Sequence, residues 1–347
     1  MNANIAELVA DALKMTSTIP GGVLNSSARA VPFTAGGSRR YFLRLSDGER
    51  SVVALIEPSN RAGLQRYYDI GTFLRENGIG APEIYTFNRD RGILLMEDLG
   101  DCTLEKLWIR GNGIKSIYKS CIDLLCRLQT EVTVEAKRGG SPSLSVFGKE
   151  EFLEETDYFE REFMGRFKPE ISLPDWERER NKLAEKLSSA PCVFMHRDFQ
   201  SRNIIIREGR PRLIDFQTSY LGPSFYDAAS LLKDPYVSLP PETVEELLEY
   251  YYRSLSNQNA EQGYQFDQFR DLFTTAGIQR NLQALAAYAK LGFGDGKGEF
   301  LRSIHPALVL LERGARENGS YPAVQGMAES FLNQISERDL LIDNRRI

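Results

Sequence analysis

The sequence predicts an α+β fold of two lobes, in which a small antiparallel sheet precedes a mostly helical part. The length of 347 residues is more than one compact core usually needs, which favours two lobes. β-forming runs gather in the first part of the chain, and long patterns of helical periodicity dominate after it. We place the boundary near Glu97–Gly100, which divides the chain into residues 1–98 and 99–347.

The first lobe has alternating strand and helix signals. In chain order, we expect a short amphipathic helix up to Leu13, strands at Tyr41–Leu45 and Ser51–Ile56, a helix through Leu64, Tyr67, Ile70 and Leu74, and a buried strand at Gly92–Met96. The turn-rich stretch around Asp47-Gly48 joins the two strands as a hairpin. Asn77-Gly78 is a typical end for the helix.

The second lobe has four long helical patterns. They cover Ile114–Gln129, Glu150–Phe167, Glu242–Leu255 and about Gly277–Leu291, with a short β region at Cys192–Asp215 between them. The helix at Glu150–Phe167 is acidic, with Glu155 among its carboxylates. Such a patch could attract a polycationic acceptor, but acidic helices usually present a solvated face. Tyr158, Phe159 and Phe163 form its expected buried side.

Composition excludes several functional classes. The net charge of −5 gives no basic face for nucleic acid. No run approaches the length of apolar residues that would span a membrane. The four cysteines lack a C-x-x-C pair, and the N-terminus lacks a basic leader region, so we expect reduced thiols in a cytoplasmic protein.

Three oxygen-bearing side chains are predicted to converge at the mouth of one hairpin. Ile204–Arg207 and Arg212–Ile214 have strand character, with a turn between them. Asn203 precedes the first strand and Asp215 follows the second, while Asp198 lies on the loop just before Asn203. Oxygen ligands suit Mg²⁺, and a further carboxylate suits a base for a hydroxyl nucleophile. Metal, orientation and charge neutralisation are what phosphoryl transfer requires.

The motif is more specific than any of its residues. A single Asp beside a strand is usually a turn or cap residue. Here His196-Arg197-Asp198 is followed by Asn203, a hairpin and Asp215-Phe216, which matches the kinase signature set.

The chain resembles the aminoglycoside phosphotransferase/choline kinase superfamily over nearly its whole length. Besides the motif above, the resemblance rests on Gly36–Tyr41 for a phosphate-loop hairpin, Leu94–Asp101 for the hinge and Leu221–Leu232 for the segment after the metal loop. Within the superfamily it is most similar to the bacterial kinases that phosphorylate the anomeric hydroxyl of N-acetylmuramate and N-acetylglucosamine. The resemblance implies a bilobal protein-kinase-like fold, with ATP and Mg²⁺ as cofactors.

The resemblance also implies roles for individual residues. Asp198 is expected as the catalytic base, and Asn203 and Asp215 as the Mg²⁺ ligands. Asp227 is expected to pin the catalytic loop, to whose scaffold His196 and Arg197 belong, with Arg197 as one possible partner. The expected nucleotide-binding residues are Gly36, Gly37, Ser38, Arg39, Arg40, Glu97 and Leu99.

Three departures from the usual kinase pattern bear on function. The strand Ser51–Ile56 carries no lysine to grip the phosphates, so either the activity is weakened or Arg39 or Arg40 supplies the charge; we favour the second. Gln200 stands where protein kinases have a lysine, which argues against a protein substrate. Gln217 stands in the metal loop in place of a glycine and either hydrogen-bonds the acceptor or braces the loop.

Two further residues are candidates for binding the acceptor. Arg280 either pairs with an acidic or acetyl group of the substrate or makes a surface salt bridge. Asp234 either lines the acceptor pocket or has a structural role.

The main hypothesis is an ATP-dependent kinase of a small-molecule acceptor, a sugar hydroxyl, with the anomeric hydroxyl of an N-acetylated amino sugar preferred. Two alternatives remain: a kinase of an aminoglycoside, choline or homoserine with the same fold, or a nucleotide-binding pseudokinase that acts as a partner protein.

Overall fold

The chain forms two compact units in the computed structural model. The structure describes residues 3–19, 24–25, 27–33, 40–111, 114–139, 142–169, 171–257 and 263–335. Unit 1 comprises Met1–Cys102, Glu135–Ser143 and Ile204–Thr218, and unit 2 comprises Thr103–Val134, Leu144–Asn203 and Ser219–Ile347. Besides the N-terminal residues expected from the linear division into 1–98 and 99–347, unit 1 includes Glu135–Ser143 and the hairpin at Ile204–Leu213.

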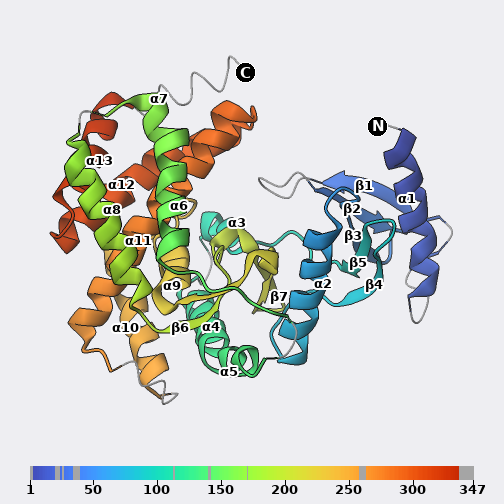
Figure 1. Ribbon diagram of the computed structural model, residues 1–347. Helices are drawn as coiled ribbons and strands as arrows, with labels where there is room; N and C mark the ends of the chain where they lie inside the picture. The colour runs from blue at the N-terminus through green and yellow to red at the C-terminus, as the bar shows by residue number, and fades with distance from the viewer. Residues whose placement is uncertain are drawn as a thin grey trace. The chain divides into compact units, whose positions relative to one another are not determined.

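Unit 1 is built on a five-stranded antiparallel sheet (Figure 1). Its strands are β1 (Arg29–Phe33), β2 (Tyr41–Ser46), β3 (Ser51–Ile56), β4 (Ile84–Asn88) and β5 (Ile93–Glu97), in the order β1-β2-β3-β5-β4. The predicted strands β2, β3 and β5 are confirmed, and β1 and β4 were not predicted. Both of these are edge strands: β1 carries Pro32, and the register of β4 shifts between Ile84 and Thr86. Pro and irregular pairing weaken the period-two signal.

The two faces of the sheet are covered by different helices (Figure 1). α1 (Ala3–Met15) packs Leu8 and Ala12 against the β3 face that carries Val52 and Ala54. α2 (Arg61–Glu76) lies toward the opposite face, where the Tyr67 hydroxyl lies 3.3 Å from the Met96 sulfur. Because successive strand residues point to opposite faces, the apolar run of β3 fills both layers.

The hairpin that precedes Asp215 completes unit 1. β7 (Ile204–Arg207) and β8 (Arg210–Leu213) pair with Ile204 opposite Leu213. The turn residues Glu208 and Gly209 have φ angles of 53° and 73°, as a two-residue hairpin loop favours. The Leu213 N–H donates to the Gly80 carbonyl at 2.8 Å, which joins the hairpin to the segment after α2. The predicted hairpin is confirmed, with β8 beginning two residues earlier than expected.

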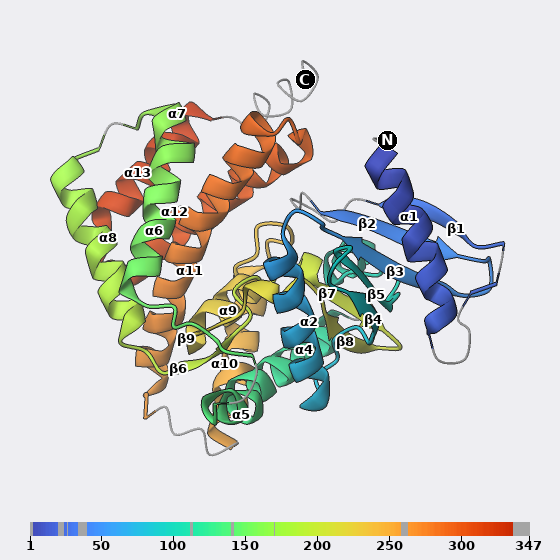
Figure 2. The ribbon, with the colours of Figure 1, turned by 45° about the vertical axis from the view of Figure 1, so that its right-hand side comes forward.

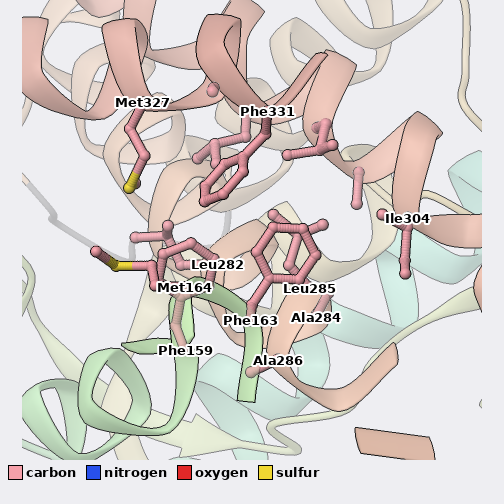
Figure 3. Packing of buried hydrophobic residues seen from close by; sticks show 14 of the residues in the cluster. Phe159, Phe163, Met164, Leu282, Ala284, Leu285, Ala286, Ile304, Met327 and Phe331 are labelled. Atoms are coloured by element: carbon pink, nitrogen blue, oxygen red, sulfur yellow. The ribbon is translucent and has the colours of Figure 1, made fainter. Parts of the chain in front are cut away.

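Unit 2 is mostly helical. Its helices are α3 (Leu104–Arg110), α4 (Ile114–Arg127), α6 (Lys149–Phe159), α7 (Gly165–Phe167), α8 (Leu173–Ser188), α9 (Ser224–Leu232), α10 (Pro241–Asn257), α11 (Phe266–Ala289), α12 (Ile304–Asn318) and α13 (Pro322–Gln334). The short sheet of β6 (Cys192–Met195) and β9 (Tyr220–Pro223) lies within this unit. Helices α6, α8, α11, α12 and α13 lie side by side in Figure 2, and their apolar side chains form one buried cluster. Figure 3 shows part of this cluster, with residues of α6, α11, α12 and α13 packed together.

The four predicted helices of unit 2 are present, with changed bounds. α11 begins eleven residues before the expected Gly277, and its buried side includes Arg280. The acidic helix continues beyond α6 through a π-helical turn at Glu160–Met164. Phe159 and Phe163 are buried, as predicted, and contact Phe331 of α13. Within the described ranges, the structure contains no helix that is both long and apolar enough for a membrane span.

Candidate active site

The predicted catalytic loop of unit 2 is held at its start by a buried carboxylate. β6 leads directly into His196, and α9 brings Asp227 beneath the loop. One Asp227 oxygen accepts the His196 N–H at 2.6 Å and the other accepts the Arg197 N–H at 2.9 Å. Burial raises the pKa of Asp227 to about 7, although the two N–H groups favour its ionised form. Asp227 thus contacts the loop backbone, which fixes the path of the chain into Asp198.

Arg197 adopts a strained backbone conformation. Its φ of 75° lies in the left-handed region that bulky side chains avoid. The guanidinium donates to Glu155 at 3.3 Å, so its side-chain partner is Glu155 and not Asp227. Glu155 also accepts the Tyr226 hydroxyl, with both oxygens at 3.0 Å. Strain of this kind persists where the surrounding contacts over-determine a functional loop.

Asp198 projects a partly open carboxylate from this loop. Its side chain is 33% exposed, and Oδ1 lies 3.2 Å from the Arg280 guanidinium. Among the described residues, no donor contacts its Oδ2. The Asp198 carbonyl accepts the Asn203 Nδ2 at 3.0 Å, which fixes the Asn203 amide. The Asn203 Oδ1 therefore faces away from that carbonyl and has no donor in the described part of the chain.

A second buried carboxylate holds the far end of the loop. Asp234 accepts the Ser201 N–H at 2.9 Å with one oxygen and the Tyr236 N–H at 2.9 Å with the other. Burial raises the pKa of Asp234 above its usual value. Of the two roles considered for Asp234, these contacts favour the structural one, since both oxygens are engaged by the backbone.

Arg280 lies beside Asp198 and not on the surface. It is 6% exposed, and its Nη2 contacts both Asp198 and the Gln200 Oε1, the latter at 3.0 Å. Its Nε donates to the Ser230 hydroxyl at 3.1 Å, and its Nη1 donates to Gln283. The surface salt bridge considered for Arg280 is therefore wrong, because α11 turns this position into the interior of unit 2.

The predicted metal loop belongs to unit 1. Asp215 follows β8 by two residues and has a φ of 62°, a second strained position at a predicted site residue. The Gln217 amide donates to the Asp215 Oδ1 at 2.8 Å, and the Gln217 carbonyl accepts the Arg66 guanidinium at 2.7 Å. These contacts favour the bracing role of Gln217, which orients the Asp215 carboxylate.

Arg40 lies close to the same carboxylate. Its Nη1 is 3.9 Å from the Asp215 Oδ1, and its Nε donates to Glu57 at 2.9 Å. The side chain of Arg40 is 14% exposed, so this guanidinium is fixed near the end of β3. The other expected phosphate-loop residues, Gly36, Gly37, Ser38 and Arg39, lie outside the described residues.

The backbone and carboxylate of Glu97, in the predicted hinge, are hydrogen-bonded within unit 1. The Glu97 N–H donates to the Glu83 carbonyl at 2.7 Å, and its carboxylate accepts Arg207 at 2.9 Å and Arg212 at 2.7 Å. The Leu99 backbone makes no hydrogen bond within the described residues. The Glu97 N–H is therefore engaged within the sheet, and the backbone N–H and carbonyl of Leu99 are not.

Three residues of this site were not predicted. Gln200 was used only as an argument against protein substrates, and Glu57 was not considered. Glu155 was expected on a solvated face, yet only 4% of this residue is exposed, and its carboxylate accepts a hydrogen bond from Arg197 of the predicted catalytic loop. Its spacing of three after Phe152 and four before Phe159 was a usable signal, since those positions share one face of a helix.

The side chains predicted as metal ligands have the chemistry that Mg²⁺ prefers. Asn203 and Asp215 offer oxygen atoms, and the orientation of the Asn203 amide leaves its Oδ1 available. Within the described ranges, no three His, Cys, Asp or Glu side chains gather as a metal cage. Mg²⁺ bound by kinases needs only one or two protein side chains, because phosphate oxygens and water complete its shell.

Comparison with known proteins places this geometry in context. The sequence model of the phosphotransferase enzyme family matches residues 29–268. A protein of Neisseria meningitidis serogroup B called N-acetylmuramate/N-acetylglucosamine kinase is 29% identical over 286 residues, which cover 80% of this chain and 83% of that protein. A protein of Pseudomonas aeruginosa with the same name is 28% identical over 279 residues, which cover 80% and 81%.

Solved structures share the fold at lower identity. Choline kinase from Cryptosporidium parvum has a TM-score of 0.63 and 14% identity, and covers 97% of this chain and 98% of its own. APH(2")-IIa in complex with gentamicin has a TM-score of 0.57 and 15% identity, and covers 94% and 98%. At these identities the likeness shows the fold alone, and it confirms the predicted α+β, protein-kinase-like architecture.

Proposed function

Since the chain belongs to the phosphotransferase enzyme family and is a kinase with an alcohol group as acceptor, we propose that it transfers the γ-phosphate of ATP to a sugar hydroxyl. The proposed substrate is the anomeric hydroxyl of N-acetylmuramate or N-acetylglucosamine, as the names of the relatives at 29% and 28% identity suggest. The product is then a sugar 1-phosphate for recycling of cell-wall sugars. We propose a cytoplasmic location, where ATP is available.

The observation that carries the proposal is the Asp198 carboxylate. Its Oδ1 is held at 3.2 Å by Arg280, and its backbone is fixed through Asp227, so Oδ2 remains for a hydroxyl. A base within hydrogen-bond reach of a hydroxyl can orient it and take its proton during attack. The acceptor oxygen forms its bond to the γ-phosphorus while the bond to the bridging oxygen of ADP breaks. The hydroxyl proton passes to Asp198.

The remaining residues hold the phosphates and the loop. We propose Asn203 and Asp215 as the Mg²⁺ ligands, where the bound ion would neutralise phosphate charge. Arg40 supplies the cation that β3 lacks, and Gly36–Arg39 and Leu99 complete the nucleotide site. Arg40 is supported by its position near Asp215, since a guanidinium there can reach both the metal-loop carboxylate and a phosphate.

The test is an acceptor screen with purified protein, ATP and Mg²⁺. We expect N-acetylmuramate and N-acetylglucosamine to support ADP release, and ³¹P–¹³C coupling in the product to place the phosphate on the anomeric carbon. Asp198→Ala should lower kcat by at least about 10²–10⁴-fold while the protein remains folded. Turnover of choline, homoserine or an aminoglycoside without turnover of either sugar would refute the proposed substrate. Retention of most of the rate in Asp198→Ala would remove this residue from the role of base.

A further inference from the structure

The Gln200 amide has a fixed orientation beside Asp198. Its Oε1 accepts the Arg280 Nη2 at 3.0 Å. A guanidinium has only donors, so the amide atom that faces it must be oxygen, and the Nε2 group must point away. No acceptor contacts this Nε2 in the part of unit 2 that the structure describes. The loop therefore presents two N–H donors next to the carboxylate proposed as the base.

Arg280 holds these two groups as one rigid pair. The same Nη2 contacts Asp198 at 3.2 Å and Gln200 at 3.0 Å, while Ser230 and Gln283 engage its other nitrogens. A buried guanidinium with four partners has little freedom to leave. Arg280 thus holds Gln200 and Asp198 in a constant relative position. The pair offers one open acceptor oxygen on Asp198 and one open donor group on Gln200.

The other carboxylates of unit 2 near this pair are occupied. Both oxygens of Glu155 accept the Tyr226 hydroxyl, and one of them also accepts Arg197. Both oxygens of Asp227 and of Asp234 accept backbone N–H groups. A cationic group placed beside Asp198 would find the donors of Gln200 and Arg280 in place of a further carboxylate.

We propose that Gln200 is a specificity residue, which selects alcohols with a hydrogen-bond-accepting oxygen next to the reacting hydroxyl and rejects those with an ammonium there. The inference rests on the proposed function, in which Asp198 takes the hydroxyl. An acetamido carbonyl, a carboxylate or a ring oxygen satisfies the Gln200 N–H groups. An ammonium has donors only, so it leaves both sides with unpaired N–H groups.

The matched substrates are N-acetylglucosamine and glucosamine, which differ only in the group beside the anomeric hydroxyl. At pH of about 6.5, the amine of glucosamine is mostly protonated. We expect wild-type kcat/KM to be at least about 100-fold higher for N-acetylglucosamine. Gln200→Leu should lower kcat/KM for N-acetylglucosamine about tenfold or more and narrow this ratio. Gln200→Glu replaces the donors with a carboxylate and should shift preference toward glucosamine by at least about tenfold.

Gln334→Glu, at an exposed position at the end of α13, is the matched charge control. We expect this variant to keep the wild-type ratio of kcat/KM values for the two substrates. If Gln200 had a purely structural role, both variants would lower kcat/KM for N-acetylglucosamine and for glucosamine by the same factor. The ratio of the two values would then stay unchanged, and this result would overturn the inference. An unchanged kcat/KM for N-acetylglucosamine in Gln200→Leu would also overturn it, while the proposed function would stand.

The two failures can be told apart. If the acceptor screen finds another alcohol that carries a neighbouring oxygen acceptor, the proposed sugar is wrong. The inference is then tested on that alcohol and its amine analogue with the same variants. If choline or another alcohol with a neighbouring ammonium is the best substrate of the wild type, the inference and the proposed function both fail.

Discussion

Asp227→Asn tests the electrostatics of the catalytic loop. The wild-type carboxylate is 1% exposed and accepts two backbone N–H groups, at 2.6 Å from His196 and 2.9 Å from Arg197. Asparagine keeps one acceptor oxygen and turns a donor toward the other N–H. Leaving buried donors unpaired costs about 1–3 kcal/mol. The variant is therefore expected to be less stable than the wild type at acidic pH.

The pH dependence of this difference follows from the raised pKa. Burial raises the pKa of Asp227 from 3.8 to about 7. As pH rises, Asp227 ionises in the unfolded chain before it ionises in the folded protein. The contribution of this group to the free energy of unfolding is therefore fully present below pH 3.8 and is lost as pH rises through about 7. At 1.36 kcal/mol per pH unit, ionisation of Asp227 should lower the free energy of unfolding of the wild type by about 3 kcal/mol between pH of about 5 and about 8. The asparagine variant lacks this titration.

The assay is denaturant unfolding of both proteins at several pH values between these limits. The difference in unfolding free energy between wild type and variant cancels the other titrating groups, which the two proteins share. We expect this difference to shrink by about 3 kcal/mol as pH rises. A difference that stays constant within about 1 kcal/mol would show that the two N–H groups outweigh burial and that Asp227 ionises near its usual pKa.

Two further predictions address the phosphate grip and the core. Arg40→Ala should raise KM for ATP about tenfold or more, because it removes the guanidinium that lies 3.9 Å from the Asp215 carboxylate. Arg40→Lys should restore part of the affinity for ATP. A KM for ATP that is unchanged in steady-state rate measurements of Arg40→Ala would exclude Arg40 from the nucleotide site. Phe331→Ala should lower the free energy of unfolding by about 3–5 kcal/mol, because the Phe331 ring is fully buried and packs against Phe163 (Figure 3). The centroids of these two rings are 4.9 Å apart. Leu173→Ala, at a side chain that is 66% exposed, is the control and should cost less than about 0.5 kcal/mol; equal losses would contradict this account of the core.

Strands with strong local signals were predicted, and edge strands were not. β3 and β5 carry continuous apolar runs, because the sheet buries them on both faces. β2 is rich in β-forming residues, and its buried Leu43 and Leu45 alternate with less buried neighbours. β1 contains Pro32 and is largely exposed, and β4 is half-buried along its length, so neither has a clear alternation. Edge position is a property of the assembled sheet, and no window of the sequence reports it.

The site shows the same division between local and remote information. The sequence by itself determined the types and the spacing of the candidate site residues: Asp198, Asn203 and Asp215 lie within one short segment, and local hairpin rules organise that segment. Only the tertiary structure decided that Arg280, separated from Asp198 by 82 positions, fixes its carboxylate, and that Glu155 lies buried beneath Arg197. Contacts of this kind depend on which helical faces pack together. They arise from the packing of whole helices, which residue spacing within a segment does not encode.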